Sequence, residues 1–80
     1  MLTKEQCRAG RGLLGLSQKV LSAKSKVNAR TILDFEAGKR SPNPATLLVL
    51  RQTLEDAGVQ FIPENGGGAG VRLAKRDGNS

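Results

Sequence analysis

The side chains of this chain that could do chemistry are Arg30 and the basic residues around it. A guanidinium presents two parallel N–H groups that match the O6 and N7 acceptors of guanine in the DNA major groove, so Arg30 is the candidate for reading a base. A phosphate contact and a solvated position are the alternatives. Lys19, Lys39 and Arg40 would hold phosphates without regard to sequence, and such binding weakens as salt rises.

These residues lie in a stretch that predicts two short helices joined by a tight turn. Ser17 is the expected N-cap of a helix over about residues 18–24, and Asn28 is the expected N-cap of a helix over residues 29–37. Only residues 25–27 separate the two, so the helices must turn sharply against one another. This arrangement is a helix-turn-helix, whose second helix enters the major groove.

Helical spacing assigns a buried and an outward side to each of the two helices. In the first we expect Val20 and Leu21 to point inward. In the second we expect Ile32 and Phe35 to point inward. The outward side of the second helix would then carry Ala29, Arg30, Leu33, Asp34 and Ala37.

Two further helices are expected around this pair. Thr3 caps the first, which runs to about Leu14, and the predicted apolar residues of this segment are Leu2, Cys7, Leu13 and Leu14. Asn43 and Pro44 start the last helix. Its apolar stripe is Leu47, Leu50, Leu54 and Ala57, broadened by Leu48 and Val49, so this helix is either deeply buried or shared with a partner.

The chain after Gly58 changes to a strand-like pattern. Residues 59–62 and 71–74 are β-rich and flank a glycine-rich segment, which predicts a β-hairpin with a flexible loop. The expected fold is therefore mainly α: a small four-helix helix-turn-helix domain over residues 1–58, then a C-terminal β-hairpin over residues 59–76. Residues 77–80 are expected to be a disordered tail.

The charge is strongly basic and unevenly placed. Thirteen Lys and Arg against seven Asp and Glu give a net charge of +6 in 80 residues. Residues 1–40 hold nine of the basic and three of the acidic side chains, whereas residues 41–70 hold one and three. A positive field on one half favours a polyanion such as nucleic acid, and an ordinary soluble surface is the alternative. Two phenylalanines are too few for an aromatic RNA-binding sheet.

Nothing in the sequence favours catalysis. The chain has no histidine and one cysteine, Cys7, which we expect to pack in the core. Glu55 and Asp56 are adjacent and do not share a helix face. The glycine run 66–70 lacks the lysine of a nucleotide-binding loop. We therefore expect neither an enzyme nor a cofactor or metal, and the absence of a long apolar run near Met1 predicts a cytoplasmic protein with no membrane segment.

The chain resembles the phage-repressor and Cro type of regulator, also called the XRE helix-turn-helix family. The resemblance covers roughly residues 2–58, and short bacterial members are also similar through the glycine-rich turn to Leu73. The family is an all-helical DNA-binding domain, usually a homodimeric transcriptional regulator, so the resemblance implies a repressor-like fold. The resemblance rests on three short sequence motifs that occur in this order: Leu16-Ser17-Gln18, Thr31-Ile32 and Phe35-Glu36-Ala37-Gly38-Lys39.

The resemblance also implies roles for individual residues. Gln18 matches a glutamine that starts the second helix and touches phosphate. Glu36 matches an acid that pairs with an arginine of the first helix, here Arg11. Lys39 and Arg40 match a phosphate-contacting loop. The positions that face phosphates and base edges are Asn28, Ala29, Arg30 and Asp34.

Several of these positions carry a second interpretation from their own chemistry. Asn28 is a helix cap first. Ala29 could meet a thymine methyl or only fill space, and Asp34 could accept from a cytosine amino group or exclude wrong sequences. Lys26 stands where the family commonly has glycine, which predicts a strained positive φ. Leu33 stands where a polar residue is usual.

Two functions follow as hypotheses. The first is a sequence-specific DNA-binding regulator, a homodimeric repressor that places the helix at residues 28–37 in the major groove of a palindromic operator. The second is an antitoxin or another protein-interaction module whose main ligand is a protein. Dimerisation could use the fourth helix or pair hairpin edges between subunits, and packing of the hairpin on its own helices is the alternative.

Overall fold

The computed structural model describes residues 1–63 and 66–74. Across these residues the chain forms four helices followed by a two-stranded antiparallel sheet. The elements are α1 (Lys4–Leu14), α2 (Gln18–Ser25), α3 (Ala29–Glu36), α4 (Pro44–Asp56), β1 (Val59–Ile62) and β2 (Gly70–Leu73). The predicted mainly-α fold with a C-terminal hairpin is confirmed. The predicted tail at residues 77–80, and the hairpin residues Lys75 and Arg76, lie outside the described residues.

The helices begin where polar caps accept backbone hydrogen bonds. Ser17 Oγ accepts from Val20 N at 3.1 Å, Asn28 Oδ1 from Arg30 N at 2.7 Å, and Asn43 Oδ1 from Thr46 N at 2.8 Å. Thr3 and Gln6 form the full capping box predicted for α1. These bonds satisfy N–H groups that a helix N-terminus leaves without partners, so the sequence sets each helix start locally.

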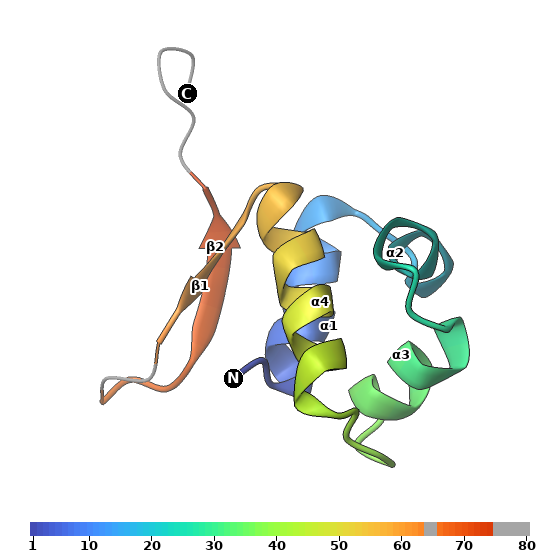
Figure 1. Cartoon of the computed structure of the whole chain (residues 1–80). Helices are drawn as coiled ribbons and strands as arrows, with labels where there is room; N and C mark the ends of the chain where they lie inside the picture. The colour runs from blue at the N-terminus through green and yellow to red at the C-terminus, as the bar shows by residue number, and fades with distance from the viewer. Residues whose placement is uncertain (64–65, 75–80) are drawn as a thin grey trace.

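α1 and α4 form the middle of the molecule, with α2 and α3 on one side and the hairpin on the other (Figure 1). The core lies between these layers. Its buried apolar side chains are Leu2, Cys7, Leu21, Ile32, Phe35, Leu47, Leu50, Leu54 and Val59. Since apolar side chains from all four helices and from β1 meet there, burial of apolar surface holds the orientation of α2 and α3.

The hairpin packs one face on its own helices. Phe61 pairs in register with Val71, and both pack against the core. On the other face Arg72 Nε donates to Gln60 Oε1 at 2.7 Å. Gln6 of α1 also donates through Nε2 to the carbonyl of Gly70 at 3.2 Å, which ties β2 to the first helix.

Some of the predicted orientations are wrong. Val20 is 42 % exposed rather than inward, because Leu21 and Ser25, four residues apart, form the buried stripe of α2. Leu13 is likewise exposed. On α4 the wider stripe is not buried: Leu48 and Val49 are exposed, and so is Ala57, which caps the helix. α4 therefore buries one face only.

Candidate nucleic-acid interface

The turn between α2 and α3 is fixed by its own polar side chains. Ser22 Oγ donates to the carbonyl of Val27 at 2.6 Å, and Val27 N donates to Ser25 Oγ at 3.1 Å. Lys26 ends α2 in the left-handed conformation with φ 66, as predicted, and its N–H donates to the carbonyl of Ser22. The backbone of Lys26 is strained in this conformation, because its Cβ is crowded at positive φ. A glycine at this position would have no Cβ and would avoid the strain.

Glu36 anchors the end of α3 to α1 and α2. Its carboxylate is buried, with 3 % of the side chain exposed, and it accepts from Arg11 Nη2 at 2.7 Å and from Arg11 Nε at 3.0 Å. Gln18 Nε2 donates to the same carboxylate at 3.0 Å. The pairing of Glu36 with Arg11 was predicted and is confirmed. The contact of Gln18 with Glu36 was not, because no local sequence signal joins residues so far apart.

The charges of this cluster shift the pKa values of its members. Burial pushes the pKa of Glu36 up, but the hydrogen bonds from Arg11, Gln18 and Cys7 and the charge of Arg11 outweigh burial, so the pKa lies below its ordinary value. The hydrogen bond to Glu36 raises the pKa of Arg11. Burial, followed by the nearby Glu36 carboxylate, raises the pKa of the Cys7 thiol to about 12. Cys7 is thus a core residue, as predicted, whose thiol lies 3.4 Å from Glu36 Oε2.

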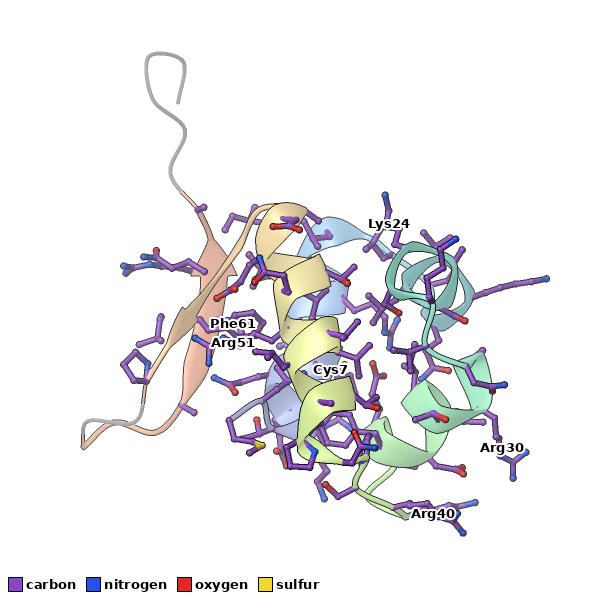
Figure 2. All side chains as sticks on the ribbon, viewed as in Figure 1. Cys7, Lys24, Arg30, Arg40, Arg51 and Phe61 are labelled. Carbon is purple, nitrogen blue, oxygen red and sulfur yellow. The ribbon has the colours of Figure 1, made fainter. Side chains whose placement is uncertain are left out.

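The anchored helix turns its other side to solvent, as Figure 2 shows for Arg30. The Arg30 side chain is 72 % exposed, and Ala29 and Leu33 are also exposed. Asp34 is mostly covered at 20 % exposure and forms an ion pair with Arg30, with Nε 3.2 Å from Oδ1. The predicted outward side of α3 is therefore present, although Asp34 is more covered than its neighbours.

The loop after α3 lies beside this surface. α3 ends with Ala37 as its C-cap and Gly38 at φ 77. The backbone N–H groups of Lys39 and Arg40 then donate to the carbonyl of Asp34, at 2.9 and 3.4 Å. Both side chains are exposed, and Arg40 projects on the same side of the molecule as Arg30 (Figure 2).

A shallow pocket of about 160 Å³ joins α3 to this loop and is called here the Asp34 pocket. It is lined by Arg30, Thr31, Asp34, Arg40 and Pro42. Three residues proposed from the sequence thus meet at one place, together with Thr31 and Pro42, which were not expected there. Thr31 is adjacent to Arg30 in the sequence, but it lines the pocket because the loop that carries Arg40 and Pro42 lies against α3.

The other candidate residues lie around the pocket or beneath it. Lys19 is exposed on α2, and Asn28 is exposed while it caps α3. Gln18 is half-buried with its amide turned to Glu36, so part of its hydrogen-bonding capacity is used inside the protein. Within residues 1–63 and 66–74, no cluster of three His, Cys, Asp or Glu side chains could hold a metal, and no helix is long and apolar enough to span a bilayer.

Two short helices held at a fixed turn, the second of which exposes an arginine beside a basic loop, define a helix-turn-helix DNA-binding domain. The family model described as Helix-turn-helix matches residues 8–55. The chain belongs to this family, as an XRE-type domain. The match covers α2, α3, the part of α1 from Arg8 onward and all of α4 except Asp56, so it includes the whole surface described above. No curated protein matches the chain.

Proposed function

We propose that this helix-turn-helix protein is a sequence-specific transcriptional regulator in the cytoplasm, a homodimeric repressor that inserts α3 into the major groove of a palindromic double-stranded operator. The observation that carries the proposal is the exposed side of α3, where Arg30 lies next to Asp34 and Arg40 on a helix anchored from behind by Glu36. An immobile helix with an exposed guanidinium is what direct readout of a base requires.

The proposed DNA-binding residues divide into two groups. Arg30, Ala29 and Asp34 face the base edges. Backbone affinity comes from Gln18, Lys19, Asn28, Lys39 and Arg40, whose contacts with phosphate carry no sequence information. The charge distribution supports this division, because the net charge of residues 1–40 alone equals that of the whole chain.

A selection from random duplexes tests the proposal directly. We expect enriched sequences with two symmetric half-sites about one helical turn, or about 34 Å, apart, because one small domain reads few base pairs. Binding to the enriched duplex should fall steeply with salt, with a log–log slope of about 0.9 for each phosphate neutralised. A flat slope with no preference over random duplex would contradict the proposal.

The variant Arg30→Ala separates readout from general affinity. We expect it to abolish preference at the contacted base pair, a loss of about 1–3 kcal/mol of discrimination, while the fold stays intact. The fold is checked by circular dichroism. If the ratio of the affinities for the enriched and the random duplex is unchanged in this variant, Arg30 is not one of the residues that recognise bases.

The second candidate function is a protein-interaction module, such as an antitoxin, with DNA binding secondary. Exposed apolar side chains favour it, above all Leu33 on α3 and Leu48 on α4. This function predicts that a partner protein, and not duplex DNA, is retained at physiological salt.

A further inference from the structure

Arg30 and Asp34 form a pair whose geometry suits base recognition. They are four residues apart on α3 and therefore share one face of the helix. Arg30 Nε lies 3.2 Å from Asp34 Oδ1, but its N–H bonds to Oδ2, at 3.4 Å. The arginine is largely exposed and the aspartate largely covered.

The contact engages the inner edge of the guanidinium. Because Asp34 is bound through Nε, the two terminal amino groups of Arg30 have no partner within the described residues. Those two groups form the fork that fits the O6 and N7 atoms of guanine. Asp34 thus restrains the guanidinium plane and leaves its recognition edge free.

The Asp34 carboxylate is largely covered by the protein. Oδ1 is buried and accepts no hydrogen bond within residues 1–63 and 66–74. A base cannot reach this oxygen, so Asp34 acts through Arg30, with which it lines the Asp34 pocket.

One base satisfies the free edge of Arg30. Guanine presents two neighbouring acceptors, O6 and N7, in the major groove, whereas adenine presents N7 beside an amino donor. A guanidinium whose Nε is held 3.2 Å from Asp34 Oδ1 keeps its two terminal amino groups available for this pair of acceptors. The arrangement therefore favours G·C over A·T.

We propose that Asp34 is a positioning residue of this surface: through its contact with Nε it holds the Arg30 guanidinium so that the two terminal amino groups meet the O6 and N7 atoms of one guanine. This inference rests on the proposed function, since it assigns the base pair that the DNA site reads. Asp34 serves selectivity at the expense of affinity, because its negative charge faces a polyanion.

The test compares Asp34→Ala with a matched control. Glu55→Gln neutralises an acid in another i,i+4 pair, where Arg51 Nε also lies 3.2 Å from the carboxylate, on α4 near the hairpin (Figure 2). Duplexes enriched by the wild-type protein are remade with each of the four base pairs at every position, and binding is measured for all three proteins.

We expect the wild-type protein to prefer G·C at one position of the half-site by about tenfold or more. Asp34→Ala should reduce this preference to about threefold or less and should bind random duplex more tightly, since a repulsive charge is gone. Glu55→Gln should keep the preference. Unchanged preference in Asp34→Ala, or an Asp34-dependent preference for A·T, would overturn the inference while the proposed function stands.

A measurement without DNA tests the positioning role. Solvent exchange of the Arg30 Nε–H, followed by nuclear magnetic resonance in the free protein, should be slower in the wild-type chain than in Asp34→Ala. Equal exchange rates would overturn the positioning of Arg30. If the wild-type protein prefers no sequence at all, the proposed function fails and the inference fails with it, an outcome distinct from the loss of Asp34 dependence alone.

Discussion

Arg11 and Glu36 are joined by two parallel hydrogen bonds, Nη2 to Oε1 at 2.7 Å and Nε to Oε2 at 3.0 Å, although 25 residues separate them in sequence. Arg11 also donates through Nη1 to the carbonyl of Leu16, at 2.9 Å. One guanidinium therefore fixes the end of α1, the start of the helix-turn-helix and the end of α3. Since base readout requires a fixed helix, this pair is the structural support of the proposed interface.

Removing either partner should destabilise the fold strongly. Arg11→Ala leaves a buried carboxylate without its countercharge, and we expect a loss of about 3–5 kcal/mol in the free energy of unfolding, measured by urea denaturation. The double variant Arg11→Met with Glu36→Leu is the control, because replacing both charges by apolar groups should cost much less. A loss under about 1 kcal/mol for Arg11→Ala would show that the pair is not the support described.

The lowered pKa of Glu36 makes stability depend on pH in one direction. In the unfolded chain this carboxyl titrates near its ordinary value of about 4.3, above its value in the fold. The pair therefore contributes fully above the unfolded pKa, and its contribution is lost as pH falls through the folded pKa.

The measurement for this prediction is urea denaturation of the wild-type chain and of Glu36→Gln from pH 7 downward. The difference in unfolding free energy between them should be constant above about pH 5 and should narrow as the solution becomes more acidic. A difference that stays constant or widens in acid would contradict the assignment.

The turn residue Lys26 offers a gain in stability. At φ 66 a Cβ is strained, so Lys26→Gly should stabilise the protein by about 1 kcal/mol, observed as a higher melting temperature. Lys24→Gly in the last turn of α2 is the matched control and should destabilise by about 1 kcal/mol. Equal effects of the two substitutions would mean that backbone conformation at Lys26 is not the cause.

The sequence predicted the helices well because their signals are local. Thr3, Ser17, Asn28 and Asn43 each cap a helix within three residues of themselves, and each cap was expected from residue type alone. The strands were likewise visible as β-rich segments beside glycines. The helix starts agree with the prediction, whereas the ends of α2 and α3 differ from it by one residue, as where Ala37 caps α3 instead of belonging to it.

The parts that sequence reasoning missed depend on contacts between distant residues. Gln18 forms a hydrogen bond with Glu36, and Gln6 forms one with the backbone of Gly70. Both bonds join elements that are far apart in the sequence, and no local sequence pattern indicates which distant residues will be partners. Val20 was misplaced because a short amphipathic helix leaves its inward direction ambiguous between adjacent apolar residues. The ion pair of Arg30 with Asp34 could have been predicted from its i,i+4 spacing. The low exposure of Asp34 beside the loop after α3 could not have been predicted in this way.

The basic loop should contribute affinity and no selectivity. Replacing Arg40 by alanine should weaken binding to enriched and random duplexes by the same factor and reduce the salt slope by about 0.9, since one phosphate contact is lost. Arg72→Ala on the hairpin is the control, because β2 lies on the far side of the helices from α3 (Figure 1). If Arg40→Ala changes the ratio of the affinities for the enriched and the random duplex, Arg40 instead belongs to the residues that recognise bases.

Dimerisation through α4 is tested at Leu48. This side chain is 65 % exposed beside Met1 and Pro44, which with Leu2, Leu47 and Arg51 line an apolar hollow of about 200 Å³. Leu48→Glu adds a charge that a solvated helix tolerates but that an apolar interface between two copies does not. We therefore expect an intact fold, a monomer by sedimentation equilibrium, and loss of palindrome binding with residual binding to a half-site.

Leu73→Glu on β2 is the comparison, since that residue is also exposed but lies on the hairpin. If Leu73→Glu separates the subunits and Leu48→Glu does not, the interface is formed by the hairpin and α4 is free of the partner.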